Sequence, residues 1–295
     1  MVLFVRTVET RGIASPPPDG SVYQQQISCR ELRRDPSRLY EKFSQNMLTR
    51  LLISLCLLVS ARQITVKPIT IYLIGDSTLS VKAVADYPET GWGMPFAHFF
   101  DETVRVDDRA MNGCSTGSFL TENRWQPVVD SLQPGDYVLI QFGHNDEVKT
   151  KKTYTTESEF RTNLLRYVNE TRARKAHPVL ITPVARRKFN AAGELEDTHA
   201  IYAELVRTVA SEQAIPLIDL DRQSQALLRQ LGPNASKLLF NHLAPGEHPN
   251  YPSGRTDDTH FNELGARRMA ELVLASLRSL APDLTAQLRQ PVSGR

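Results

Sequence analysis

From residue 69 onward, short apolar runs alternate with longer segments whose apolar residues recur at helical spacing. The apolar runs predict strands, and they span residues 69–74, 104–106, 137–142, 178–181 and 216–218. The run from Tyr137 to Phe142 is the clearest, because the turn-forming sequence Pro134-Gly135-Asp136 precedes it. These runs predict a sheet of about five strands.

Three segments show the period of an amphipathic helix. The first carries apolar residues at i, i+4, i+7 and i+8, which are Phe160, Leu164, Tyr167 and Val168. The second runs from about residue 198 to 213 and carries Ile201, Leu205 and Val209. The third runs from about residue 262 to 280 and carries Met269, Val273 and Leu277. We expect each named set to face the core.

Strands that alternate with helices imply βαβ units and a parallel sheet covered on both faces. In such sheets the working site lies beyond the carboxyl ends of the strands. Polar clusters follow three of the predicted strands, at residues 75–78, 109–113 and 143–146. We therefore expect a functional site where these three clusters meet.

The first sixty residues differ from the rest of the chain. Residues 1–46 are polar and irregular, and we interpret them as a non-native or disordered extension. Residues 47–61 combine Arg50, an apolar stretch of about ten residues and a small-residue exit at Ser60-Ala61, which is typical of a secretory signal peptide. The stretch is too short to span a bilayer, and a buried helix is the alternative. We predict one domain over residues 62–295 and a secreted or periplasmic protein.

Composition and charge exclude several classes of protein. The chain is 41% hydrophobic and 23% charged, with a formal net charge of +2, so charge indicates neither a nucleic-acid partner nor a membrane partner. Of the three cysteines, only Cys114 lies outside the predicted extension and signal peptide, so the mature chain would form no internal disulfide.

Three motifs carry candidate chemistry, and each has a structural alternative. Ser77 follows the first strand in Gly-Asp-Ser-Thr and could expose a nucleophilic hydroxyl, although such residues also cap helices. Asn145 follows the third strand and could donate its amide to an oxyanion, although asparagine also suits turns.

The third motif joins a histidine to nearby acids, just before the last predicted helix. A catalytic histidine needs a carboxylate to fix its tautomer, and Asp257 could fold back onto His260 across a turn. We expect Asp258 to point the other way, toward solvent or the start of the last helix. A structural histidine is the alternative.

Together these motifs resemble those of the SGNH (GDSL-like) hydrolases over roughly residues 69 to 280. Gly113, after the second strand, supplies the remaining signature element. The resemblance implies a three-layer α/β/α sandwich of the flavodoxin-like kind. It also implies Ser77 as nucleophile, His260 as base and Asp257 as its partner, with an oxyanion hole formed by Ser77, Gly113 and Asn145. No metal or organic cofactor is expected.

Within this superfamily the chain is most similar to the rhamnogalacturonan acetylesterases. The matching segments are G-D-S-T at 75–78, G-W-G at 91–93, S-F-L-T-E-N-R-W at 118–125, G-H-N-D at 143–146, Gly246 to Pro252, and D-x-x-H-F ending at Phe261. The resemblance implies a serine esterase that deacetylates an acetylated polysaccharide or oligosaccharide, such as pectic rhamnogalacturonan. A lipase or thioesterase of the same fold and a non-catalytic sugar-binding relative are the alternatives.

Several positions bear on the substrate. Relatives commonly carry a basic residue after the glycine of the second block, where this chain has Cys114, which weakens the case for an acidic substrate. Trp92 and Tyr251 could stack on a sugar ring, although core packing explains Trp92 equally well. His242 and His248 could bind a metal but are more often surface residues when no carboxylate accompanies them.

Overall fold

We describe residues 68–289 of a computed structural model of the chain. The predicted extension and signal peptide lie outside these residues. Within the described part, no helix combines the length and the apolar character that crossing a membrane requires.

Helices and strands alternate along most of the described chain. The strands are β1 (Ile69–Gly75), β2 (Val104–Asp108), β3 (Tyr137–Gln141), β4 (His177–Ile181), β5 (Leu217–Ile218), β6 (Phe240–Leu243) and β7 (Arg255–Phe261). The α-helices are α2 (Gly93–Phe96), α3 (Thr116–Thr121), α4 (Trp125–Ser131), α5 (Glu157–Ala173), α6 (Ala200–Glu212), α7 (Leu220–Ala235), α8 (Glu263–Leu280) and α9 (Pro282–Thr285). Three 3₁₀ helices of the described chain are η1 (Val84–Asp86), η2 (Ala97–Phe99) and η3 (Ser236–Leu239).

Five strands form a parallel sheet in the order β2-β1-β3-β4-β5. All five are the strands that the apolar runs predict. The order reverses between β1 and β3, and a cleft at the carboxyl ends of the strands is expected at such a switch point. The loops after β1, β2 and β3 therefore open onto one edge of the sheet.

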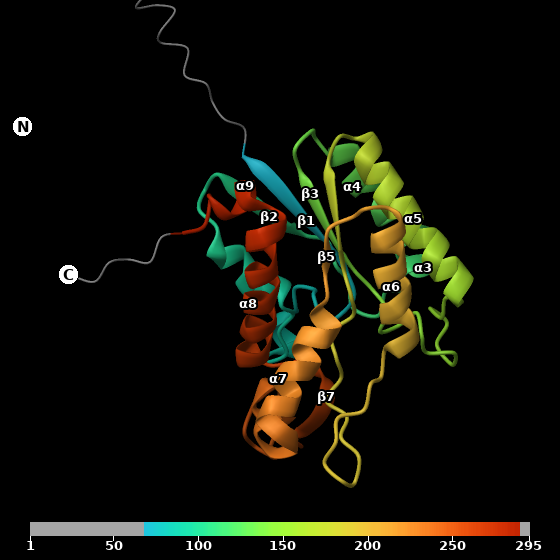
Figure 1. The fold of residues 1–295 in the computed structure, drawn as a ribbon. Coiled ribbons are helices and arrows are strands. Elements are labelled where there is room, and N and C mark those ends of the chain that lie inside the picture. Colours follow the sequence, from blue (N-terminus) through green and yellow to red (C-terminus); the bar gives the residue numbers. More distant parts are fainter. Residues whose placement is uncertain (1–67, 290–295) are drawn as a thin grey trace, which may run out of the picture. The chain divides into compact units, whose positions relative to one another are not determined.

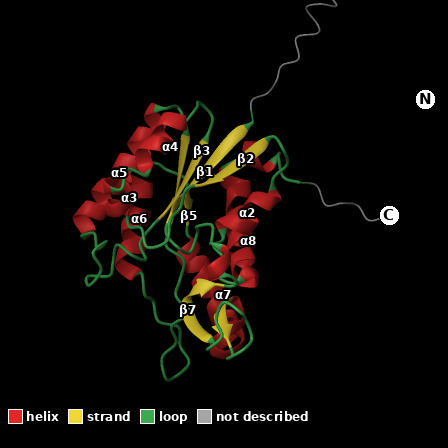
Figure 2. Cartoon of the chain, turned by 180° about the vertical axis from the view of Figure 1, so that it is seen from behind, coloured by secondary structure: helices red, strands yellow, loops and turns green. Residues whose placement is uncertain are grey.

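Helices cover both faces of this sheet, which confirms the predicted three-layer sandwich (Figure 1; Figure 2). Alternation along β1 shows how the layers form: Ile71 and Leu73 pack in a core with α2, α7 and α8, whereas Tyr72 and Ile74 pack in a second core with α3, α4, α5 and α6. The strands are apolar on both faces because both faces are covered.

The predicted helices are present, but the prediction of which residues face the core is wrong in one of them. The apolar residues named for α5 and α8 are all buried, as expected. In α6, however, Ile201 is 58% exposed, whereas Tyr202, Val206 and Val209 are buried. The buried stripe of α6 lies one residue further along than Ile201 predicted, because Tyr202 takes the inward position and donates its hydroxyl to the carbonyl of Thr155.

A second, two-stranded antiparallel sheet was not predicted. It pairs β6 with β7 and precedes α8 directly. β7 has no apolar run, and its interior is the polar sequence Thr-Asp-Asp-Thr-His. Pattern alone therefore gives no strand signal for the segment that carries Asp257 and His260.

Candidate active site

The loop after β1 presents Ser77 at the carboxyl end of the sheet. Asp76 organises this loop, because its Oδ1 accepts hydrogen bonds from the backbone N–H and the hydroxyl of Thr78. The carbonyl of Asp76 accepts from the N–H groups of Leu79 and Ser80. The resulting tight turn leaves the Ser77 hydroxyl 2.9 Å from Nε2 of His260.

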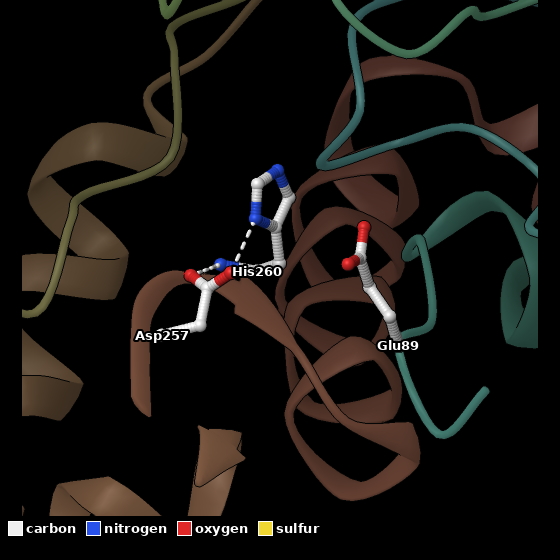
Figure 3. A group of neighbouring side chains, drawn as sticks. All are labelled: Glu89, Asp257 and His260. Carbon is white, nitrogen blue, oxygen red and sulfur yellow. Dashed lines mark hydrogen bonds and ion pairs between the residues drawn. The ribbon is translucent and has the colours of Figure 1, made fainter. Parts of the chain in front are cut away.

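β7 supplies the histidine and its carboxylate partner. Oδ2 of Asp257 lies 2.8 Å from Nδ1 of His260, while Oδ1 accepts the backbone N–H groups of Thr259 and His260 (Figure 3). The carboxylate thus folds back over three residues onto its own strand, as the D-x-x-H spacing predicts. With Nδ1 as donor to Asp257, Nε2 is the acceptor for the Ser77 hydroxyl.

Asp257 stays ionised despite its partial burial. Burial by itself raises the pKa of this carboxyl, but the hydrogen bonds and charge of His260, joined by the hydrogen bond from Arg255, outweigh it and hold the pKa well below its usual range. A permanent negative charge at Nδ1 favours the tautomer that accepts a proton at Nε2.

Asp258, the neighbouring acid, points to the other side of β7. Its Oδ1 pairs with Nη1 of Arg187 and lies 2.7 Å from Nε2 of His242. The Asp258 side chain is 44% exposed, so the expectation that it faces solvent is met, although a cation and a histidine also contact it there. The same contact gives His242 the carboxylate partner that the sequence did not reveal.

The loop after β2 brings Gly113 beside this group. Residues 111–114 form a turn closed by a hydrogen bond from the N–H of Cys114 to the carbonyl of Met111, and Gly113 has a φ of 79°. A positive φ at the third position of a turn suits glycine, since other residues are strained there. Within residues 68–289, the backbone N–H groups of Gly113 and Ser77 have no hydrogen-bond partner. Both are free to donate to a ligand.

Asn145 comes from the loop after β3 and contacts the same turn. Its Nδ2 donates to the carbonyl of Cys114 at 2.8 Å, and its Oδ1 accepts from Nζ of Lys151 at 2.6 Å. These two contacts fix the orientation of the amide and leave the second hydrogen of Nδ2 available. The structure thus brings together all five residues that the sequence singled out for chemistry.

Comparison with known proteins agrees with this geometry. The sequence model of the GDSL-like lipase/acylhydrolase family matches residues 73–268. The chain belongs to this family. The predicted membership of the SGNH (GDSL-like) hydrolases is confirmed, and so is the prediction that the protein is a carboxylic ester hydrolase.

Two relatives from Bacillus subtilis (strain 168) match most of the esterase. The rhamnogalacturonan acetylesterase RhgT is 41% identical over 219 residues, which cover 74% of this chain and 93% of RhgT. The probable rhamnogalacturonan acetylesterase YesY is 33% identical over 217 residues, or 73% of this chain and 95% of YesY.

The crystal structure of YxiM from the same species has a TM-score of 0.61 at 27% identity and covers 72% of this chain. The esterase spans 57% of the YxiM chain.

Three charged residues next to the Ser77–His260–Asp257 group were missed by sequence reasoning. Nη2 of Arg255 contacts Asp257 at 2.6 Å and Glu89 at 2.9 Å, and Glu89 in turn pairs with Lys82 at 2.9 Å. Lys82 and Glu89 lie between the Gly-Asp-Ser-Thr and Gly-Trp-Gly motifs without any spacing that marks them. Only the fold brings them to Arg255.

Glu89, Asp257 and His260 also offer ligand atoms within 4.8 Å of one another, a spacing that could suit a metal ion. Both carboxylates are instead paired with cations, because Arg255 bridges them and Lys82 holds the remaining oxygen of Glu89. We interpret this group as an ion-pair network.

The two residues predicted to contact substrate have different environments. The Trp92 prediction is wrong, because the side chain is fully buried and its indole N–H donates to Gln141 in the core. Tyr251 is half-buried, and its hydroxyl accepts from Nη1 of Arg255 while the guanidinium lies 4.9 Å from the ring centre. Tyr251 therefore supports Arg255, and its contact with a sugar stays a prediction.

Buried ionisable groups lie close behind the loops of the site. Burial raises the pKa of Asp146 to about 7, against the lowering effect of its hydrogen bonds from Thr116. Burial also holds the pKa of His144 well below its ordinary value, helped by the charges of His199 and Arg186. A neutral His144 accordingly lies behind the site.

Proposed function

We propose that the esterase removes O-acetyl groups from pectic rhamnogalacturonan, a plant cell-wall polysaccharide, through an acyl-enzyme on Ser77. The observation that carries the proposal is the continuous contact from the Ser77 hydroxyl through His260 to Asp257. This contact speaks against a non-catalytic sugar-binding role, because binding alone requires no aligned hydroxyl, imidazole and carboxylate.

Each step of acyl transfer has a group in place. Ser77 Oγ attacks the acetyl carbonyl while Nε2 of His260 takes its proton, and Asp257 stabilises the imidazolium that forms. The N–H groups of Ser77 and Gly113 and the amide of Asn145 would hold the negative charge on the carbonyl oxygen. The C–O bond to the sugar then breaks, and His260 gives the proton to the departing sugar oxygen, which leaves as a hydroxyl. A water molecule activated by the same imidazole releases acetate and restores Ser77.

The proposed substrate class rests on the relatives and on charge near the site. RhgT is named a rhamnogalacturonan acetylesterase, and YesY is named a probable one. Cys114 removes one positive charge that relatives carry, but Lys151 places another within 2.6 Å of the Asn145 amide oxygen. Lys149 and Lys152 lie on the same exposed loop. This loop suits a polysaccharide that contains uronic acids.

Ser77→Ala tests the chemistry. We expect the variant to lose at least three orders of magnitude of activity on a chromogenic acetate ester while its circular dichroism stays that of the parent. Acetate release from acetylated rhamnogalacturonan, measured beside acetylated xylan and a long-chain acyl ester, tests the substrate. Turnover within about tenfold of the parent in Ser77→Ala would remove the nucleophile assignment, and a preference for the long-chain ester would favour a lipase.

Lys151→Met separates the substrate from the chemistry. The variant should lose more kcat/KM on acetylated rhamnogalacturonan than on acetylated xylan, because the first carries carboxylates and the second is nearly neutral. Lys152→Met removes a charge from the same loop without breaking the Lys151 contact to Asn145, so it measures how much of the selective loss comes from the charge of the loop alone. An equal loss on both polymers would assign Lys151 to the support of Asn145 alone.

We also propose that the esterase is secreted or periplasmic and that residues 47–61 are removed as a signal peptide. The support is the charged, apolar and small-residue order of that segment. N-terminal sequencing of the protein recovered outside the cytoplasm tests this: a mature chain that begins near residue 62 is expected, and a retained segment 47–61 would contradict it.

A further inference from the structure

Lys82, Glu89 and Arg255 form a chain of ion pairs that we call the charged clamp. The clamp runs from Lys82 to Glu89, from Glu89 to Arg255 and from Arg255 to Asp257. Asp257 continues to His260, and His260 continues to Ser77. Nζ of Lys82 donates to the backbone carbonyl of Ser77, so the contacts close into a ring.

Lys82 joins the clamp to the loops that carry the backbone donors. Its side chain is fully buried, and its ammonium contacts the Ser77 carbonyl, Oδ1 of Asn112 and Oε1 of Glu89. A buried ammonium is tolerated only when it is paired and its N–H groups have acceptors, and these three contacts meet that need. Because Asn112 precedes Gly113, Lys82 ties the Ser77 loop to the Gly113 turn.

Glu89 holds the two cations of the clamp together. One of its carboxylate oxygens pairs with Lys82 and the other with Arg255, and its side chain is 7% exposed. Figure 3 shows its carboxylate directed toward the His260 ring, which Asp257 contacts from its own side. A carboxylate oxygen of Glu89 and one of Asp257 lie within 4.8 Å of an imidazole nitrogen. Lys82 and Arg255 pair with these carboxylates, so the four charges cancel. His144, which interacts electrostatically with His260, stays neutral because burial and neighbouring positive charge lower its pKa.

We propose that Glu89 is a positioning residue of the esterase, which through Arg255 and Lys82 balances the charge around His260 and holds the Ser77 loop against it. This inference rests on the proposed acyl transfer at Ser77. It predicts that each member of the clamp acts on the charge state of the imidazole in the direction that its own charge dictates.

Removing single charges should move the pH dependence in opposite directions. Glu89→Gln leaves the clamp with one net positive charge, which disfavours the imidazolium, so the acidic limb of kcat/KM should move to lower pH. Arg255→Met leaves one net negative charge and should move that limb to higher pH. A unit charge about 5 Å away in a partly solvated site corresponds to a displacement of roughly half to one pH unit.

A pH series with a chromogenic acetate ester tests the proposal. The midpoint of the acidic limb does not depend on the fraction of active protein, so partial misfolding of a variant does not obscure it. Glu89→Asp keeps the charge and should keep the midpoint of the parent. Arg187→Met is the matched control, because it breaks the equivalent arginine–aspartate pair at Asp258 on the other side of β7. Its limb should stay in place.

Opposite displacements in Glu89→Gln and Arg255→Met, with lower kcat and little change in KM, support the inference. Displacements in the same direction, or none, overturn it and reduce the clamp to structural support. The test is separate from the proposed function, because activity retained in Ser77→Ala would contradict the nucleophile whatever the clamp variants do.

Discussion

Two adjacent acids of β7 do different work at the residue scale. Successive residues of a strand point to opposite sides, so Asp257 reaches His260 while Asp258 reaches Arg187 and His242. The pair therefore offers two substitutions of identical chemistry one residue apart.

Asp257→Asn should lower kcat by roughly 10³–10⁴, because an amide at Nδ1 no longer favours the tautomer in which Nε2 accepts the proton. Asp258→Asn should keep kcat near that of the parent and lose about 1 kcal/mol of stability, because its carboxylate is 44% exposed and the pair with Arg187 is partly screened. Steady-state kinetics and chemical unfolding of both variants decide the matter. A severe loss of kcat in Asp258→Asn alone would exchange the two assignments.

Among the elements, helices α5 and α6 show how far apolar spacing predicts packing. The residues named for α5 are buried, whereas the spacing chosen for α6 put Ile201 inward and the structure puts it outward. The physical reason is that Tyr202, a larger residue with a hydroxyl that finds a backbone acceptor, takes the inward position. Apolar periodicity therefore predicted both helices, but it predicted the buried residues correctly only for α5.

Truncating one apolar residue in each helix gives a direct comparison. Phe160→Ala should cost about 3–5 kcal/mol of unfolding free energy, because its ring is fully buried and packs edge-to-face against Tyr202 of α6. Ile201→Ala should stay within about 0.5 kcal/mol of the parent, since its side chain is mostly exposed. Urea unfolding followed by circular dichroism measures both. Similar losses would mean that Ile201 is covered in solution.

The antiparallel pair β6–β7 was not predicted, and the reason lies in the residue pattern of β7. A strand that carries Asp257, Asp258 and His260 has polar residues on both sides, so neither alternation nor an apolar run marks it. The D-x-x-H motif could be found in the sequence although the strand could not, because the contact of Asp257 with His260 depends only on three residues of local backbone.

For the molecule as a whole, the sequence was enough to predict the five parallel strands and the five residues of the candidate active site. It was not enough to predict the charged clamp. Apolar runs and short motifs are local signals. Glu89, which pairs with Lys82, contacts Arg255 only because β7 folds back beside the loop after β1, and no local spacing encodes that contact.

Buried acids should give the whole molecule a distinctive pH dependence. The pKa of Asp146 is about 7 in the folded protein against an ordinary value of 3.8, so the folded state holds this proton more tightly than the unfolded chain. The stability from that proton is complete below pH about 4 and is lost as pH rises toward 7.

Asp146→Asn should remove this loss, because its amide oxygen can still accept from Thr116 without a titrating proton. Between pH 5 and pH 7 the parent should lose on the order of 2 kcal/mol relative to the variant. Opposing contributions, such as that of His144, are common to both proteins. Unfolding at the two pH values measures the difference, and parallel curves would contradict the raised pKa.

The order of the site residues along the chain also bears on biosynthesis. Ser77, Gly113 and Asn145 lie in the loops after the first three strands, whereas His260 and Asp257 lie in β7, after the whole parallel sheet. A nascent chain still short of β7 therefore carries Ser77 without His260, its proposed proton acceptor. On the proposed mechanism, ester cleavage requires β7, so a partly synthesised chain should be inactive until that strand has been made and has folded.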